Sequence, residues 1–303
     1  MADNGRADNG RQDNWTQACW DNYRGLWLAE QTWLEQAVAD VVSGRTVGGP
    51  RDAAPKMDKE SLRERYSVSN GIAVVNVSGP MQKQDSKYGG TSTLATRAIL
   101  RDTRARDDVK GVMLSIDSPG GLHSGTDELA SEVGATAREM PVHAHVEGLG
   151  ASAAYWVGSQ ASRLTATRTS RVGSIGSILY LVDQSGQLAA EGIRVYKVAS
   201  GPLKGAGDGL TGVTEAELEY AESIVAEATA PFYEAVQAGR GLSDDELAEV
   251  ISGETFSADT ARDRGLVDGV EGFDAAMSAL AKELRGRGRE QAARSRSRRV
   301  TGA

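Results

Sequence analysis

Short hydrophobic runs and amphipathic segments alternate along the middle of the chain. The hydrophobic runs are rich in β-branched residues and predict strands at Ile72–Val77, Val109–Ile116, Pro141–Val146, Arg163–Ala166, Leu179–Val182 and Val195–Val198. Helical spacing of apolar residues predicts helices at Thr93–Arg106, up to about Glu139, at Gln187–Glu191, over 214–239 and at Ser243–Ile251. This alternation predicts an α/β fold built from repeated βαβ units around a largely parallel sheet.

The two ends of the chain differ from this central pattern. Residues 1–14 repeat the sequence Asp-Asn-Gly-Arg and are expected to be disordered. From Trp15 to about Val42 the apolar residues return to one face of a helix, which holds four of the five tryptophans. We therefore expect a Trp-rich helix and a linker over 15–59, one main domain over 60–281, and a disordered Arg-rich tail over 282–303.

The composition is typical of a soluble globular protein. The 303 residues are 40% hydrophobic and 25% charged, which is enough to bury a sizeable core. The single cysteine, Cys19, excludes an internal disulfide framework and a multi-cysteine zinc site, and with three histidines we expect neither a metal nor a cofactor. No apolar run has the length of a membrane span and the N-terminus does not resemble a signal peptide, so the sequence predicts a cytoplasmic protein.

Charge is distributed unevenly between the tail and the rest of the chain. The formal net charge is −8, but the tail from Lys282 onward carries eight basic residues against two acidic ones. The remaining chain therefore has a net charge of about −14. This acidic body argues against a general affinity for nucleic acid, and we expect no nucleic-acid partner.

One serine lies among residues that are too small to cover it, in the segment Gly148-Leu-Gly-Ala-Ser-Ala-Ala-Tyr-Trp156. A serine in such a bend between a strand and a helix can present its hydroxyl to a cleft, where nearby backbone N–H groups bind an oxyanion. The alternative is a helix of small residues that packs closely against the sheet. Ser152 is therefore a candidate nucleophile.

A tight turn, Asp117-Ser-Pro-Gly-Gly121, follows the second predicted strand. Its glycines allow the backbone to approach a ligand closely, so its N–H groups are candidates for one half of an oxyanion hole. The N–H of Ser152 would then supply the other half. Most turns of this composition have no catalytic role, so this turn indicates an oxyanion hole only in combination with Ser152.

The base that would activate Ser152 is the third component of the candidate site. The three histidines, His123, His143 and His145, all precede Ser152, so a base from the later half of the fold must be another residue type. A desolvated lysine can fill this role. Between Leu164 and Lys282 the only lysines are Lys197, inside a predicted strand, and Lys204, in a loop free of other charges. The residues favour Lys204 and leave Lys197 open.

Four elements in this order resemble the signal peptide peptidase family of Ser-Lys serine peptidases, which includes phage head maturation proteases. They are Asp117-Ser-Pro-Gly-Gly121, Gly150-Ala-Ser-Ala-Ala-Tyr-Trp156, Val172-Gly-Ser-Ile-Gly176 and Lys204, and the match covers roughly residues 70–280. The resemblance implies a crotonase/Clp-like α/β fold and the hydrolysis of peptide bonds by a Ser-Lys dyad.

The same resemblance assigns a role to each residue. It implies Ser152 as the nucleophile, Lys204 as the general base and Ser174 as a hydrogen-bonding partner that orients the lysine. The backbone N–H groups of Gly120 or Gly121 and of Ser152 would hold the oxyanion. Whether the dyad forms within one subunit or between two stays open.

The resemblance also implies partners and a setting. Similarity to the phage branch predicts a homo-oligomeric endopeptidase that cuts capsid, portal or scaffold proteins in the host cytoplasm or the prohead. One alternative is a cytosolic signal-peptide-peptidase-like protease that degrades peptides. Two further alternatives are a crotonase-type acyl-CoA enzyme, which also binds an oxyanion with paired N–H groups, and a catalytically inactive scaffold subunit.

Overall fold

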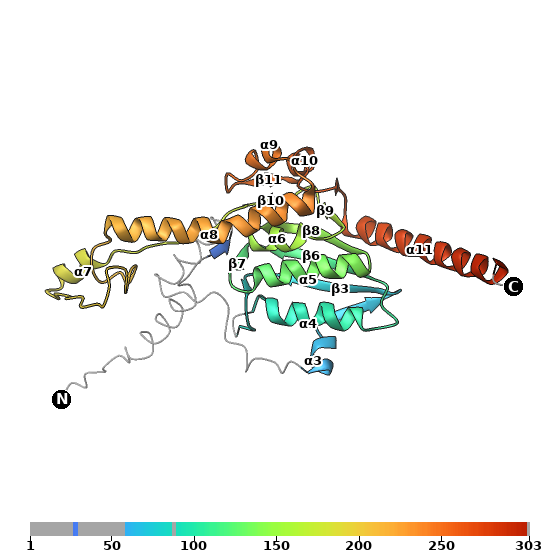
Figure 1. The fold of residues 1–303 in the computed structure, drawn as a ribbon, viewed down its shortest axis with the longest axis horizontal. Helices are drawn as coiled ribbons and strands as arrows, with labels where there is room; N and C mark the ends of the chain where they lie inside the picture. The colour runs from blue at the N-terminus through green and yellow to red at the C-terminus, as the bar shows by residue number, and fades with distance from the viewer. Residues whose placement is uncertain (1–26, 30–57, 87–88, 302–303) are drawn as a thin grey trace, which may run out of the picture.

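The computed structural model describes residues 27–29, 58–86 and 89–301 (Figure 1). The predicted disordered segment 1–14, most of the predicted Trp-rich helix and nearly all of the linker lie outside these residues. The three described residues within the predicted helix form a strand, β1 (Trp27–Ala29), so the helix prediction is wrong at this point.

A mixed sheet of eight strands forms the centre of the fold. Its strands are β2 (Tyr66–Ser69), β3 (Ile72–Ser78), β6 (Gly111–Ser118), β8 (Val142–Ala151), β9 (Arg163–Ala166), β10 (Arg171–Gly173), β11 (Thr255–Ser257) and β12 (Gly269–Val270). The main path runs β11-β10-β8-β6-β3-β2, and β9 pairs with the first half of β8 and with β12. All pairs in this sheet are parallel except β2–β3 and β10–β11 at the two edges, which confirms the predicted α/β class with a largely parallel sheet.

Helices cover both faces of this sheet. Three of them, α4 (Thr93–Arg104), α5 (Thr126–Glu139) and α6 (Ala153–Gly158), lie on one face over the larger core, and α3 (Lys59–Arg63) lies beside them (Figure 1). The first turns of α11 (Phe273–Thr301) pack on the other face, where Ala276 and Leu280 contact Ile72 and Met113. Burial on two sides explains why the strand sequences are almost continuously apolar.

A second, four-stranded sheet lies next to the first. It consists of β1, β4 (Met81–Gln82), β5 (Thr91–Ser92) and β7 (Gly120–Leu122), in the order β1-β7-β4-β5. Strand β7 begins at Gly120, inside the predicted Pro-Gly-Gly turn, and extends one residue past this turn to Leu122. Gly121 is required there because a Cβ atom at this position would lie 2.0 Å from the carbonyl oxygen of Met81.

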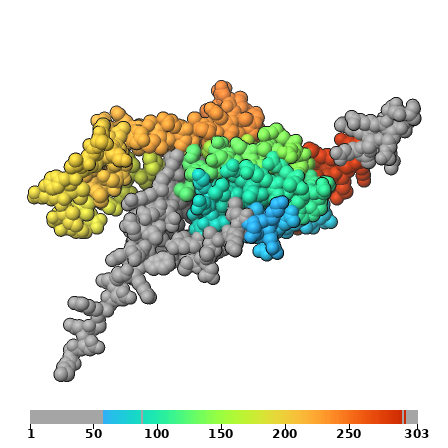
Figure 2. All heavy atoms as spheres, turned by 60° about the horizontal axis from the view of Figure 1, so that its bottom comes forward, coloured from blue at the N-terminus to red at the C-terminus, as the bar shows by residue number. Residues whose placement is uncertain are grey.

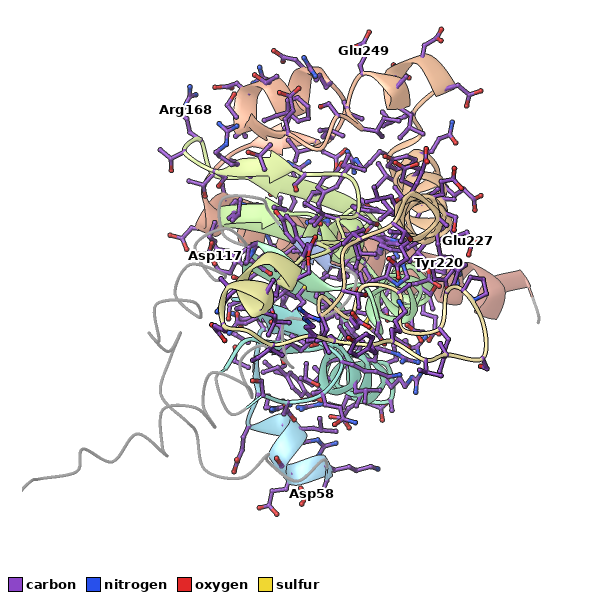
Figure 3. All side chains as sticks on the ribbon, turned by 90° about the vertical axis from the view of Figure 1, so that its left-hand side faces the viewer. Asp58, Asp117, Arg168, Tyr220, Glu227 and Glu249 are labelled. Carbon is purple, nitrogen blue, oxygen red and sulfur yellow. The ribbon has the colours of Figure 1, made fainter. Side chains whose placement is uncertain are left out.

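The longest described segment outside the core is an arm, which we define as residues 177–228. It contains α7 (Ser185–Ala190) and the first half of α8 (Glu215–Arg240), and it projects away from the sheets (Figure 1). Figure 2 shows it as a lobe beside the core, and Figure 3 shows Tyr220 and Glu227 on its helical part. From Thr229 onward α8 returns to the core, and Pro231 lies at this change of environment.

Three further segments differ from their predicted secondary structure. The predicted strands Leu179–Val182 and Val195–Val198 lie in the arm and form no strand. The predicted disordered tail is instead the C-terminal part of α11, which is helical up to Thr301. The shorter α9 (Asp244–Ala248) and α10 (Ala258–Asp263) complete the described elements.

The return of α8 to the core depends on an aromatic stack. The rings of Phe232 on α8 and Trp156 on α6 are parallel within 8°, with centroids 4.8 Å apart, and both side chains are fully buried. We expect Phe232→Ala to lower the free energy of unfolding by about 3–5 kcal/mol, because it leaves a cavity beside Trp156. Chemical denaturation measures this loss. Leu218→Ala, on the exposed half of the same helix, is the matched control, and an equal loss there would contradict the interpretation.

Candidate active site

Ser152 lies in the bend between β8 and α6, as the sequence predicts. Its backbone is left-handed, with φ 55° and ψ −121°, although it is not a glycine. The residue is fully buried, and its Oγ atom has no hydrogen-bond partner within the described residues. Unpaired buried hydroxyls and strained backbone angles both cost free energy, and they concentrate at functional sites.

Strand register brings the predicted motifs together around this bend. On one side of β8, Ser118 at the end of β6 pairs with Gly150. On the other side, Gly173 at the end of β10 pairs with Ala151. The Asp117–Gly121 turn and Ser174 therefore flank Ser152 at the carboxyl ends of three neighbouring parallel strands, where α/β proteins usually bind ligands.

Ser174 resembles Ser152 in its backbone. Its φ is 53°, it is 6% exposed, and its N–H donates to the carbonyl oxygen of Glu254 at 2.7 Å. The preceding Gly173 has a φ of 127° and accepts a hydrogen bond from the N–H of Ser152 at 2.8 Å. Two adjacent strands, β8 and β10, are thus each followed by a serine with a positive φ, and this hydrogen bond joins the two strand ends.

The same hydrogen bond changes the prediction for the oxyanion hole. The N–H of Ser152 is already used by Gly173, and the N–H of Gly120 donates to Ser118 Oγ at 3.2 Å. The first helical residue after the nucleophile is Ala153, and N–H groups in a first helical turn lack intrahelical acceptors. The donor next to the hydroxyl is therefore better assigned to Ala153 than to Ser152.

Asp117 is a site residue whose role the sequence reasoning missed. Its Oδ1 atom accepts a hydrogen bond from the N–H of Leu149 at 3.0 Å, which joins the turn to the segment that carries the nucleophile. Gly148 leaves room for this carboxylate, because a Cβ atom there would lie 2.7 Å from Asp117 Oδ1. The glycine at position 148 was the available signal, but its reason appears only in the fold.

The histidines have partners elsewhere. His143 Nε2 lies 2.9 Å from Glu283 Oε2 on α11. His145 contacts the hydroxyls of Thr165 and Thr167, and burial lowers its pKa. His123 Nε2 bonds to the carbonyl oxygen of Ala228 at 3.1 Å. None of them forms a hydrogen bond with Ser152 Oγ, which agrees with the exclusion of a Ser-His pair on sequence grounds.

The two candidate lysines both lie in the arm and differ in their contacts. Lys197 Nζ donates to Glu217 Oε1 at 2.8 Å, so its ammonium group has a carboxylate partner. Lys204 is exposed in a turn closed by a hydrogen bond from its N–H to the carbonyl oxygen of Gly201 at 3.1 Å. Because Ser152 Oγ has no hydrogen-bond partner, the structure does not bring Lys204 and Ser152 together within this chain.

The Lys197–Glu217 pair predicts an acid-sensitive anchor for the arm. Hydrogen bonds from Lys197 and from Thr214 lower the pKa of Glu217 from 4.5 to about 2. Since the folded-state pKa is the lower one, the pair stabilises the arm fully above pH 4.5 and loses this effect as the pH falls towards 2. We expect hydrogen exchange in the arm to be faster in Glu217→Gln than in wild type at pH 6, and the difference to shrink in acid. A pH-independent difference would contradict this interpretation.

The described residues contain no group of three or more His, Cys, Asp or Glu side chains that could hold a metal ion. Within the same residues, no helix is both long and apolar enough to cross a membrane.

Comparison with protein families identifies the chain. The model of peptidase family S49 matches residues 135–286, half of the chain, and this match includes Ser152, Ser174 and Lys204. The chain belongs to peptidase family S49. Family membership confirms the predicted resemblance at the level of the family.

Relatives of this S49 chain come from cellular organisms and from phages. A protein of Methanocaldococcus jannaschii named as a protease is 34% identical over 71% of the chain and 65% of its own length. Head-tail preconnector protein GP5 of Enterobacteria phage P21 is 30% identical over 72% of the chain and 44% of its own length. Capsid assembly protease C of Escherichia phage lambda is 28% identical over 77% of the chain and 52% of its own length. The alignments thus span about half to two thirds of these relatives.

Solved structures give more distant matches to the S49 chain. An enoyl-CoA hydratase/isomerase family member aligns over 73% of this chain and 74% of its own, with 18% identity and a TM-score of 0.45. A point mutant of ClpP1 from Listeria monocytogenes aligns over 67% of this chain and 94% of its own, with 14% identity and a TM-score of 0.43.

Proposed function

We propose that this chain is a serine endopeptidase that uses a Ser-Lys dyad. The observation that carries the proposal is the hydroxyl of Ser152. It is unpaired and buried, and it is held by a left-handed backbone at the start of α6. Ser174 and the Asp117–Gly121 turn lie on either side of it by strand register. A nucleophile, a helix N-terminus and a close backbone turn are the parts that acyl transfer needs.

The dyad works by moving one proton between two atoms. Lys204 Nζ, as a neutral amine, takes the proton from Ser152 Oγ while that oxygen bonds to the substrate carbonyl carbon. The N–H groups of Ala153 and Gly121 stabilise the oxyanion. Collapse of this intermediate breaks the C–N bond, and Nζ returns the proton to the leaving amine. Water then repeats the cycle on the acyl-enzyme, releasing the acid and restoring the Ser152 hydroxyl.

The arm of a second copy supplies Lys204 in this proposal. Within the described residues, the exposed large hydrophobic side chains all lie between Tyr180 and Tyr220, and Tyr196 and Val198 are 79% and 97% exposed. Apolar surface of this kind favours burial against another molecule.

The proposed substrates are capsid, portal or scaffold proteins, cut during assembly in the prohead or the host cytoplasm. The names of two relatives, a head-tail preconnector protein and a capsid assembly protease, support this choice. Degradation of peptides by a signal-peptide-peptidase-like enzyme is the second candidate, supported by a 28% identical relative from Enterococcus faecium that is named as a signal peptide peptidase. Mass spectrometry of products after co-expression with neighbouring capsid genes separates the two.

The chemistry is tested by a fluorophosphonate probe, which reacts with activated serine hydroxyls. Tryptic mapping should place the adduct on Ser152, and Ser152→Ala should not be labelled. Labelling of a different serine, or none at any concentration, would contradict the proposed nucleophile.

A further inference from the structure

Strand β1 occupies the outer edge of β7. The two strands are antiparallel, with Trp27 opposite Leu122, Leu28 opposite Gly121 and Ala29 opposite Gly120. The opposite edge of β7 is already taken by Met81 of β4. A distant segment of the chain therefore fills the free edge of a strand that would otherwise present unpaired N–H and C=O groups.

The strand covered in this way is the one next to the nucleophile. β7 begins at Gly120, two residues after Ser118, which pairs with Gly150 in the strand that leads to Ser152. Helix α6, which starts at Ala153, packs against β7, and the ring centroids of Trp156 and His123 lie 6.0 Å apart just beyond it. An extended peptide that adds to this edge lies along the site by the backbone pairing of β-augmentation.

Strand β1 runs in the direction expected for the part of a peptide substrate that precedes the cleaved bond. Its chain runs from Trp27, opposite Leu122, towards Ala29, opposite Gly120 at the turn. Its C-terminal residue is thus the one nearest the candidate oxyanion turn, as expected for residues that precede a bond to be cut. Alanine is also the smallest side chain of the three.

We propose that Trp27–Ala29 is an intramolecular competitor that occupies the substrate edge of the site. This inference rests on the proposed function, because it needs Ser152 as the nucleophile. The complete burial of the Ser152 side chain is the second observation in its favour, since a nucleophile in a site open to substrate would be accessible. Peptide substrates would have to displace this segment before they reach Ser152.

A reversible cross-link tests the proposal in one full-length variant. Trp27→Cys and Leu122→Cys place two thiols at directly opposite positions, where Cβ atoms of antiparallel strands lie about 4.5–5.5 Å apart. Cys19→Ser removes the native thiol. Oxidation should lock β1 onto β7 and slow fluorophosphonate labelling of Ser152 by about tenfold or more relative to the reduced protein, as expected when few copies are open.

The outcomes separate the competitor from the nucleophile. Slower labelling after oxidation, reversed by reductant, supports the proposal. A cross-link that forms without changing the labelling of Ser152 overturns the competitor role of Trp27–Ala29. The assignment of Ser152 as the nucleophile would be unaffected by this result. Absence of the cross-link, with normal labelling, also overturns it. Absence of labelling in both the oxidised and the reduced protein contradicts the proposed function and removes the basis of the competitor.

A backbone variant gives an independent measurement without new thiols. Leu28→Pro removes an N–H and fixes φ inside β1, so it should weaken the pairing with β7 and increase the labelling rate of Ser152 several-fold. Leu28→Ala shortens the same side chain and keeps the backbone donor, so it is the matched control and should label at about the wild-type rate. Equal rates in the proline and alanine variants would overturn the competitor.

Discussion

Ser152→Ala should abolish peptide hydrolysis, with a loss in kcat of at least about a thousandfold. The hydroxyl is the only group removed, and it makes no hydrogen bond within the described residues, so no hydrogen bond is lost. Removing an unpaired buried hydroxyl should leave the melting temperature unchanged or slightly higher. Activity on a fluorogenic peptide and thermal unfolding of the same samples measure the two effects together.

A second serine, at the other end of α6, provides the matched control. Ser159 is also fully buried, but its Oγ donates to the carbonyl oxygen of Trp156 at 2.7 Å and so closes the end of α6. Ser159→Ala should lower stability by about 1 kcal/mol and keep most of the activity. If Ser159→Ala lost as much activity as Ser152→Ala, the activity would depend on the packing of α6. The loss in Ser152→Ala would then not indicate that Ser152 is the nucleophile.

The sequence could predict the core of the fold because each buried strand carries its own signal. Ile72–Val77 and Arg163–Ala166 correspond closely to β3 and β9, and the amphipathic spacing over 214–239 corresponds to α8 (Glu215–Arg240). The two strands and the part of α8 from Thr229 onward face the core, so hydrophobic burial and secondary structure agree there. The bend at Ser152 was predictable for a related reason, because small residues stand where a strand passes into a helix.

The arm and the tail were mispredicted because local pattern and environment disagree there. Val195–Val198 has the composition of a strand, yet Val198 is almost fully exposed and pairs with no strand among the described residues. The Arg-rich tail has the composition of a disordered segment, but it continues a helix whose first turns are anchored by Ala276 and Leu280 on the sheet. A helix that is already nucleated extends at little cost through such residues.

The pairing of β1 with β7 was beyond any local pattern. Trp27 fits the helical spacing of the surrounding apolar residues, and nothing in three residues specifies a partner about 90 positions away. Strand pairing at this range depends on an edge that only the folded site creates. The same holds for Asp117, whose contact with Leu149 needs β6 and β8 to lie side by side.

Lys204→Met should abolish hydrolysis as completely as Ser152→Ala, since the serine then has no base. Lys197→Met is the matched control, because Lys197 lies in the same arm and its ammonium group pairs with Glu217. We expect Lys197→Met to loosen the arm and to reduce activity only partly. Initial rates on one fluorogenic peptide, with probe labelling of Ser152 alongside, measure both variants. Equal losses in the two variants would remove the distinction between the lysines.

Mixing the two inactive variants tests where the lysine comes from. The arm that carries Lys204 projects from the core and exposes its apolar side chains, so we expect Lys204 to act on Ser152 of another copy (Figure 1). In an equal mixture of Ser152→Ala and Lys204→Met, about a quarter of such sites pair an intact serine with an intact lysine, because a head-to-tail contact joins any two copies. Activity should recover towards that fraction after subunit exchange. A mixture that stays inactive although the variants exchange subunits would place both residues of the dyad within one chain, and the arm would then have to fold back onto its own core.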